Sequence, residues 1–373
     1  MKNLVALCPY VAYRNEQLLK DCVLIPYTFM THLGYDVTVM TAQKEEFTYL
    51  NQLSGLRLDI VPTCPLEQWA DYLVDYLKNY PHEIDVLFLF GMYATYYPVV
   101  KYFKDHYQGK IILKADANSY WVSELINPNT PQYDYLIHHC DIITCEGVAM
   151  QNYLAKKWRR PIDLFRNGSR DVDFNHQLTF NSKEELIVNV GRQETGRKNT
   201  PALIKTFAQL APSFPAWRLA LIGTYEPAIK SLVERYYQLN PQLKKQLLLT
   251  GPIADKKLLE SYYAKAKIFI TASYLEGGSP NVVAEALRNG CYLVTSKIDA
   301  WQDTFAPEAG ASFDHDDLVA LSAELKQAMS DSKLCQQAFT LNRAYVQAEL
   351  SYEQQVSRLE TLLKVRGKLN DNN

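Results

Sequence analysis

The stretch SYLEGGSPNVVAEALRNGCYLVT, residues 273–295, constrains the fold most, because it predicts a helix between two strands. The apolar run Ile268–Ile270 just before it is typical of a buried strand. Asn281–Arg288 is expected to be helical, since Pro280 suits a helix start and an Asn-Gly pair suits its end. Tyr292–Val294 predicts the next strand. A strand, a helix and a second strand in this order indicate an α/β fold with a parallel sheet.

The loop before this helix has the features of an anion site. Gly277 and Gly278 allow the backbone to approach a ligand closely. Ser279 and Asn281 flank the expected helix N-terminus, where free N–H groups and the helix dipole favour a phosphate. We therefore expect these four residues to contribute to a binding site for a phosphate-bearing ligand.

Two carboxylates accompany this anion site. Glu276 lies in the loop and Glu285 in the helix. Both would repel a phosphate, so they better suit hydroxyl groups, as on a ribose or a sugar. The alternative is an ordinary crossover with a solvated loop, which this stretch alone does not exclude.

A second polar loop, VGRQETGRKN at residues 190–199, lies between a predicted strand and a predicted helix in the same half of the chain. Gly191, Arg192 and Lys198 are its candidate binding residues. Two cations beside a helix N-terminus can stabilise negative charge that grows on a leaving phosphate, without a metal. A solvated basic loop is the alternative.

The two loops together resemble the donor site of retaining family 4 glycosyltransferases, which have the GT-B architecture. That family places seven residues between its two glutamates, whereas eight separate Glu276 from Glu285, which implies one inserted residue. The resemblance implies that Arg192 and Lys198 hold the nucleotide diphosphate, that Glu276 contacts the donor sugar and that Glu285 binds the ribose hydroxyls. It also implies attack on the face that the leaving phosphate departs from, with this phosphate helping to deprotonate the acceptor.

The N-terminal half resembles the same family less specifically. GYDVTV at residues 34–39 is similar to a family phrase close to GHEVTV, at the start of a predicted second strand. Residues 9–15, expected to be a loop, replace a double glycine of the family, so this loop suits the acceptor better than the donor phosphate. Asp116 follows a predicted strand at the position of a family histidine that touches the donor sugar. A helix N-cap is the alternative role for Asp116.

The resemblance implies two facing doubly wound, Rossmann-like domains and a C-terminal helix that crosses back to the first. We expect an N-terminal, acceptor-side domain over residues 1–173, a nucleotide-sugar donor domain over 184–350 and the returning helix over 351–368. The polar stretch 174–183 is the expected boundary.

Composition excludes several other classes. The 373 residues carry a net charge of −2, which argues against binding to nucleic acid. No apolar run reaches the roughly 18 residues of a membrane-spanning helix, and no signal peptide is evident. Seven scattered cysteines, with no CxxC spacing, favour reduced thiols in a cytoplasmic protein.

Several other polar patterns bear on metal binding and on membrane binding. Asp171–Asp173 and residues 314–317 contain DxD patterns, and His138-His139 precedes an expected strand, but none of these predicts a metal site. The cluster KKWRR at 156–160 predicts either a solvated helix end or peripheral contact with the inner face of a membrane.

We therefore expect a metal-independent retaining glycosyltransferase, of hexosyl- or N-acetylhexosaminyltransferase type, with a UDP-linked sugar as donor. The expected acceptor is a hydroxyl of a glycan, a lipid-linked glycan or a protein, in the synthesis of cell-surface polysaccharide or glycoconjugate. Fold alone does not establish this activity, because GT-B folds also serve epimerases. The alternatives are a nucleotide-sugar epimerase and a non-catalytic partner subunit that binds a nucleotide or a glycan.

Overall fold

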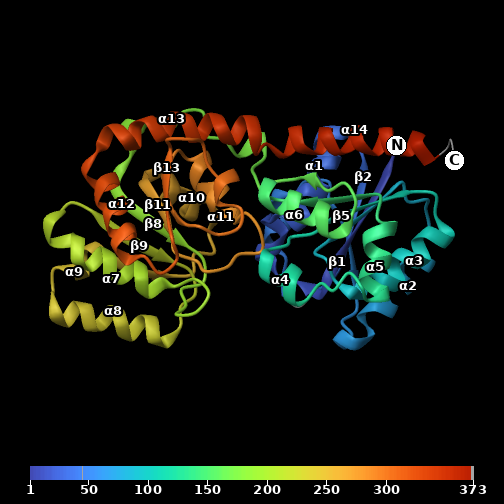
Figure 1. Ribbon diagram of the computed structural model, residues 1–373, viewed down its shortest axis with the longest axis horizontal. Helices are drawn as coiled ribbons and strands as arrows, with labels where there is room; N and C mark the ends of the chain where they lie inside the picture. Colours follow the sequence, from blue (N-terminus) through green and yellow to red (C-terminus); the bar gives the residue numbers. More distant parts are fainter. Residues whose placement is uncertain (44, 371–373) are drawn as a thin grey trace. The chain divides into compact units, whose positions relative to one another are not determined.

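A computed structural model describes residues 1–43 and 45–370, which form two compact units (Figure 1). The first unit comprises residues 1–170 and the chain from Tyr352 onward, and the second comprises Asp171–Ser351. The division at residues 170 and 171 falls just before the stretch 174–183 that composition favoured. Each unit has its own parallel sheet between helices.

The first sheet has seven parallel strands in the order β3-β2-β1-β4-β5-β6-β7. All five residues of β4 are buried, as expected of a central strand with helices on both faces. The strand order reverses between β1 and β4, and parallel sheets bind ligands at the carboxyl ends of strands that flank such a reversal. The strands are β1 Asn3–Tyr13, β2 Asp36–Gln43, β3 Arg57–Val61, β4 Val86–Phe90, β5 Lys110–Lys114, β6 Ile142–Cys145 and β7 Asp163–Leu164.

Helices connect the strands of the first unit. Helix α1, Asp21–Leu33, ends at Gly34, which has a φ of 71° and suits a helix C-terminus. The helices are α1, α2 Trp69–Lys78, α3 Tyr97–His106, α4 Ser119–Glu124, α5 Pro131–His139, α6 Val148–Trp158 and α14 Tyr352–Asn370.

The first strand is longer than predicted. Residues 9–13 were expected to be a loop, but β1 continues to Tyr13, with a shift in its pairing to β2 between Leu7 and Ala12. The Tyr13 backbone N–H donates to the Thr41 hydroxyl over 2.9 Å, and the Tyr13 ring is 1% exposed. Burial of this ring and pairing of its backbone favour the strand over the loop.

The second sheet has six parallel strands in the order β10-β9-β8-β11-β12-β13, and its order reverses between β8 and β11. Its strands are β8 Glu184–Val190, β9 Arg218–Ile222, β10 Leu247–Gly251, β11 Ala266–Thr271, β12 Tyr292–Ser296 and β13 Gly310–Phe313. Its helices are α7 Thr200–Leu210, α8 Pro227–Leu239, α9 Leu243–Gln246, α10 Lys256–Lys265, α11 Asn281–Arg288, α12 Leu318–Ser330 and α13 Ser332–Glu349.

The last helix, α14, packs within the first unit. Gln355 donates to the Arg166 carbonyl over 3.1 Å and accepts from the Arg166 backbone N–H over 2.6 Å. Val356 and Leu359 are buried in the core of that unit. The amphipathic pattern of the sequence thus matches the face that this helix buries.

Helix α5 was not expected. The histidines His138 and His139 end α5 and precede the strand β6, as expected. The Nδ1 atoms of both rings lie 2.9 Å from backbone carbonyl oxygens four residues earlier.

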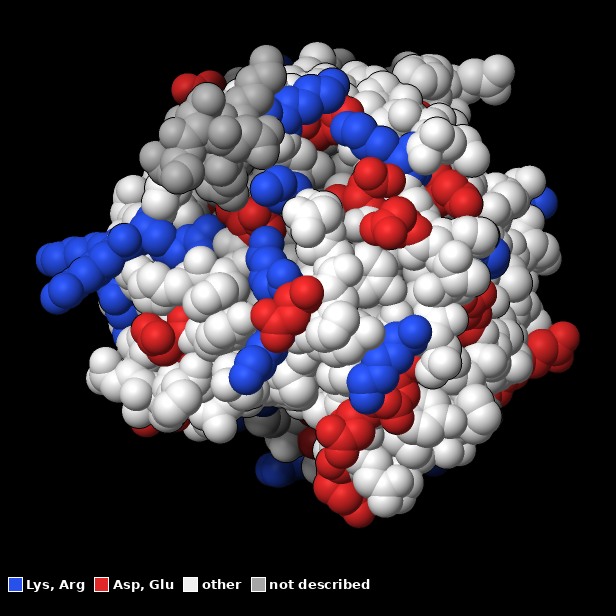
Figure 2. Space-filling view, turned by 90° about the vertical axis from the view of Figure 1, so that its right-hand side faces the viewer, with Lys and Arg blue, Asp and Glu red and all other residues white. Residues whose placement is uncertain are grey.

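Other chain-wide features agree with the composition. All seven cysteines are free thiols, and six of them are buried. Among the described residues, no helix is both long and apolar enough to cross a membrane. On the side of the molecule in Figure 2, Lys and Arg side chains are interspersed with Asp and Glu rather than gathered in one basic field.

Candidate functional site

The two polar loops singled out from the sequence follow the two strands at the reversal point of the second sheet. The loop 191–199 leaves β8, and the loop 272–280 leaves β11, which pairs with β8. The backbone N–H of Tyr274 donates to the carbonyl of Arg197 over 2.8 Å, so the loops are bonded to each other. Topology therefore brings together residues that lie about eighty positions apart in the chain.

Glycines end three neighbouring strands at this edge of the sheet. Gly191, Gly223 and Gly251 have φ values of 145°, 133° and 75°, in the left-handed region that favours glycine. A Cβ on Gly223 would lie 2.0 Å from the carbonyl oxygen of Gly191, so a larger residue would force the strands apart. The edge of the sheet therefore carries no side chains at these positions, and the backbones at the ends of β8 and β9 approach each other closely.

The helix that follows the second loop has the length and position predicted from the sequence. Pro280 is the N-cap residue of α11 and has no side-chain acceptor to cap the helix N-terminus. Gly278 has a φ of 157°, and the side chains of Ser279 and Glu276 are largely buried. The positive end of the helix dipole therefore lies beside the loop that carries Glu276.

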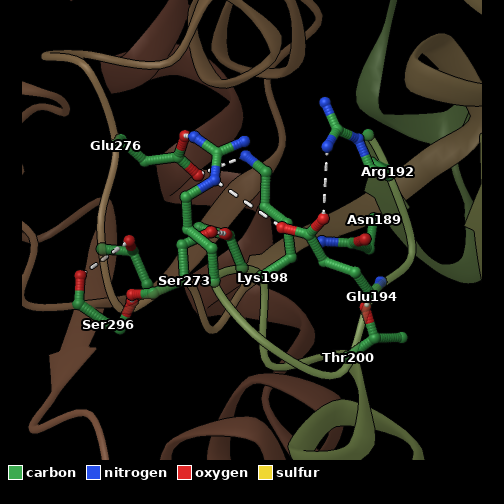
Figure 3. Close-up of polar contacts among 12 residues, drawn as sticks. Asn189, Arg192, Glu194, Lys198, Thr200, Ser273, Glu276 and Ser296 are labelled. Carbon is green, nitrogen blue, oxygen red and sulfur yellow. Dashed lines mark hydrogen bonds and ion pairs between the residues drawn. The ribbon is translucent and has the colours of Figure 1, made fainter.

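Glu276 is joined to two cations of the other loop (Figure 3). One carboxylate oxygen contacts the ammonium of Lys198, and the other lies 3.6 Å from the guanidinium of Arg197. The Glu276 side chain is 9% exposed and that of Lys198 is 19% exposed. The structure thus brings Glu276 and Lys198 together, as the sequence comparison of the two loops implied.

Arg192 pairs with a residue that sequence reasoning did not single out. Its guanidinium lies 3.5 Å from Glu194, and Glu194 also lies 3.6 Å from the Nε of Arg197 (Figure 3). The five side chains of Arg192, Glu194, Arg197, Lys198 and Glu276 form one charged cluster, which we call the switch-point cluster. In the sequence, only the alternation of positive and negative residues along 192–198 indicates that Glu194 pairs with these arginines.

A buried amide fixes the first loop. Gln193 is fully buried, and its side-chain N–H groups donate to the Asn189 amide oxygen over 2.9 Å and to the Ile222 carbonyl over 3.2 Å. Its amide oxygen accepts from the Thr200 hydroxyl over 3.2 Å. This network determines where Arg192 and Glu194, on either side of Gln193, emerge from the backbone.

Glu285 lies in a different set of contacts. Its carboxylate accepts from the ammonium of Lys256 over 2.8 Å and from the hydroxyl of Tyr263 over 2.9 Å, both on α10. Burial raises the pKa of the Glu285 carboxyl, but the charges of Lys256 and Arg288 outweigh burial, and its pKa lies below the ordinary value. Lys256 and Tyr263 were not predicted, because their relation to Glu285 depends on how two helices pack.

The residues of the DxD pattern at 171–173 have structural partners. They form a short 3-10 helix, where Asp173 lies 3.6 Å from the guanidinium of Arg288 and Asp171 accepts from the Ser351 hydroxyl over 3.2 Å. At the other DxD pattern, Asp317 caps α12 by accepting from the Ala320 N–H. Within residues 1–43 and 45–370, no group of His, Cys, Asp and Glu side chains is arranged to hold a metal ion.

Asp116 belongs to the first unit, just beyond β5. It is not a helix N-cap, because Asn118 caps α4 by accepting from the Trp121 N–H over 2.8 Å. Its φ is 45°, a left-handed conformation that is costly for a residue other than glycine and is more frequent at functional sites. The N-cap alternative for Asp116 is therefore wrong.

Two tyrosines lie near Asp116 at the reversal point of the first sheet. Tyr10 is on β1, Tyr93 follows β4, and their hydroxyls are 3.4 Å apart. Burial, with a further contribution from the Asp116 carboxylate, raises the pKa of both hydroxyls. Neutral hydroxyls beside a carboxylate are suited to hydrogen bonds with an uncharged, hydroxyl-rich molecule.

A buried ion cluster lies close to Asp116. Lys114 is 1% exposed, lies 3.1 Å from Asp21 and contacts Glu146. Burial lowers the pKa of the Lys114 ammonium, but the carboxylates outweigh burial and raise it above its ordinary value. Lys114 is therefore charged, which balances carboxylates that would otherwise be costly to bury.

The basic cluster at 156–160 is only partly available for a membrane. Lys157 donates to the Val122 carbonyl over 2.7 Å, and Arg160 donates to the Cys140 carbonyl over 2.9 Å. Trp158 is buried, so the aromatic residue of the cluster belongs to the core. Of the two interpretations, the structure favours an ordinary helix end.

Comparisons with known proteins agree on the fold. Residues 172–340 match the family model described as Glycosyl transferases group 1. A search of curated proteins gives no match.

Solved structures similar to this chain cover nearly its whole length. Sucrose-phosphate synthase from Thermosynechococcus elongatus has a TM-score of 0.76 at 17% identity and covers all of both chains. HepE from Anabaena, solved in complex with UDP, has a TM-score of 0.74 at 13% identity, over 98% of this chain and 100% of its own. WaaG, a glycosyltransferase of lipopolysaccharide biosynthesis, has a TM-score of 0.66 at 15% identity, over 96% of this chain and 99% of its own. The fold is therefore GT-B, with two Rossmann-like domains.

The lowered pKa of Glu285 predicts an acid-dependent loss of stability. A group with a depressed pKa stabilises the fold above its unfolded value, about 4.3 for Glu, and this contribution is lost as the pH falls through the folded pKa. Glu285→Gln should therefore destabilise the second unit by about 1–3 kcal/mol at pH 7. The difference from the unchanged protein should shrink as the pH falls below about 4.

Thermal unfolding across pH 3 to 8 measures both effects. The matched control is Glu234→Gln, because Glu234 pairs with Lys230 at 3.9 Å with both side chains more than half exposed. That change should cost roughly 0.5 kcal/mol or less. Equal losses in the two variants, or a Glu285→Gln difference that persists at pH 3, would contradict the assignment.

Proposed function

We propose, from the premise that residues 172–340 are a glycosyl transferases group 1 domain, that the chain transfers a sugar from a nucleoside diphosphate sugar to a hydroxyl acceptor. The observation that carries the proposal is the switch-point cluster. It sets Lys198, Arg192 and Arg197 beside the N-terminus of α11, at the carboxyl edge of a Rossmann-like sheet. The carboxyl edge of such a sheet, beside a helix N-terminus, suits a nucleotide diphosphate.

The cations have a direct chemical role in this reaction. When the bond from the anomeric carbon to the phosphate oxygen breaks, the electron pair stays on that oxygen, and negative charge grows on the diphosphate. Lys198 and Arg192 can stabilise this charge by charge-assisted hydrogen bonds, and the helix dipole of α11 adds to them. The diphosphate would draw Lys198 away from Glu276, and the Glu276 carboxylate would then accept from hydroxyls of the donor sugar in its place.

Glu285 has the role of a ribose-binding group in the proposal. Lys256 and Tyr263 hold its carboxylate from the α10 side, and this fixes the direction of its remaining acceptor capacity. The side chain keeps 18% exposure, which leaves part of it accessible to a ligand.

The donor is proposed to be a UDP-linked hexose or N-acetylhexosamine. The similar protein HepE was solved with UDP, which supports this base. We propose that transfer retains the anomeric configuration and serves the synthesis of a cell-surface polysaccharide or glycoconjugate, as the resemblance of the two loops implies. The acceptor side is proposed to include Asp116, Tyr10 and Tyr93, because their hydroxyls and carboxylate suit an uncharged glycan.

The reaction is proposed to need no metal ion. A divalent cation serves to neutralise the leaving diphosphate in metal-dependent enzymes of this kind. Here three cationic side chains and a helix N-terminus can neutralise the leaving diphosphate instead.

A donor-hydrolysis panel tests the proposed function. UDP-, GDP- and ADP-linked hexoses and N-acetylhexosamines are incubated with the protein in excess EDTA, and release of the nucleoside diphosphate is measured. Release from at least one donor is expected, and the released sugar should keep the anomeric configuration of the donor. Release from none would leave only a binding role, whereas release that requires added Mn²⁺ or Mg²⁺ would contradict the metal-independent mechanism.

Lys198→Ala tests the role of the cluster in the same assay. Loss of one preorganised donor to the developing charge should lower turnover about 100-fold, by comparison with removal of an oxyanion-hole donor. The melting temperature should change little, because Arg197 still pairs with Glu276. Lys205→Ala, a change at an exposed lysine of α7, is the matched control and should keep normal turnover. Near-normal turnover of Lys198→Ala would disprove the assignment of Lys198 to the diphosphate.

A further inference from the structure

We propose that Glu194 is a specificity-determining residue that competes with the ligand's diphosphate for Arg192 and Arg197. The competition weakens binding of the free nucleoside diphosphate more than that of the nucleotide sugar, and so promotes product release. The inference rests on the proposed function, because it concerns the same donor site.

Glu194 lies between the two arginines of the switch-point cluster. Its two carboxylate oxygens are 3.6 Å and 3.5 Å from nitrogens of Arg197 and Arg192 (Figure 3). Charge-assisted hydrogen bonds of this kind are about 2.7–2.9 Å long, so both contacts are ion pairs without a short hydrogen bond. A phosphate oxygen that forms a short bond can therefore displace Glu194 from either arginine.

The backbone of Glu194 is held in place, and its side chain is much less exposed than those of the two arginines. The backbone N–H of Glu194 donates to the Thr200 hydroxyl over 3.2 Å, and its carbonyl accepts from the Thr200 N–H over 3.1 Å. The Glu194 side chain is 10% exposed, compared with 64% for Arg192 and 41% for Arg197. When a diphosphate binds, the arginines can turn toward it, but the negative charge of Glu194 stays beside the site.

The charge of each ligand determines how strongly the Glu194 carboxylate weakens its binding. Three cations and two carboxylates leave one net positive charge. A nucleoside diphosphate sugar carries about two negative charges, and the free diphosphate carries about three above pH 7, because its terminal phosphate loses a second proton near pH 6. The charge of Glu194 therefore disfavours the product by one additional repulsion, and because the Glu194 side chain is only 10% exposed, solvent screens this charge incompletely.

Calorimetric titration of Glu194→Gln tests the inference at pH 8. The probes are UDP, UDP-glucose and uridine, with ADP and GDP as alternatives should the unchanged protein prefer another base. The variant should bind the free diphosphate roughly tenfold more tightly, a change of about 1.4 kcal/mol. The nucleotide sugar should gain about threefold, and the uncharged nucleoside should gain less than twofold.

Two controls separate charge from folding. Glu185→Gln removes a carboxylate at the other end of β8, where Glu185 pairs with Lys267, and should leave the affinity for UDP unchanged. Glu194→Asp keeps the charge but withdraws it from the arginines, so its affinity for UDP should lie between those of the unchanged protein and Glu194→Gln. It replaces the Gln variant if that variant does not fold.

The kinetics give an independent readout. In the donor assay, inhibition by added UDP should become stronger in Glu194→Gln by the same factor as the affinity. If the variant binds UDP no more tightly than the unchanged protein, or if uridine gains as much as UDP, the inference is wrong although the proposed function stands. If the unchanged protein binds none of UDP, ADP and GDP, both the inference and the proposed function fail.

Discussion

The contact between Lys198 and Glu276 joins the two loops at the reversal point of the second sheet, and the arrangement of the site depends on it. Three cations gathered in residues 192–198 repel one another, and Glu194 and Glu276 offset that repulsion while no diphosphate is bound. A site with this charge pattern can hold cations ready for a developing negative charge without a costly excess of one sign.

The frame that holds these charges is built from uncharged groups. Gly223 permits the backbone at the end of β9 to pass close to Gly191, and a larger residue there would force the strands apart. The buried amide of Gln193 fixes the loop through bonds to four neighbours, and the N-cap residue of α11 is Pro280, which has no side-chain acceptor. Precise placement of this kind matters because a transition state is stabilised only by groups that are already in position.

The sequence predicted the elements that carry a strong local pattern, such as α11 and β5, and the βα loops with Glu276 and Lys198. It did not predict contacts that depend on tertiary packing. Glu285 bonds to Lys256 and Tyr263, which belong to a neighbouring helix. Glu194 was not predicted because its role depends on the positions of two arginine side chains. The predicted first strand ended too early, because a segment that begins with Pro9 and contains several polar residues gives no sign that Tyr13 is buried. The N-cap role for Asp116 was wrong because Asn118, two residues later, caps the helix.

A crystal structure of the protein with a nucleoside diphosphate bound tests the central claim most directly. The account predicts that the β-phosphate lies about 3 Å from the ammonium of Lys198 and from backbone N–H groups at the start of α11. It also predicts that the Lys198 ammonium has moved away from the Glu276 carboxylate, which it contacts in the structure described above. A nucleotide bound away from the carboxyl ends of β8 and β11, or a diphosphate bound while the pair of Lys198 and Glu276 stays intact, would contradict the account.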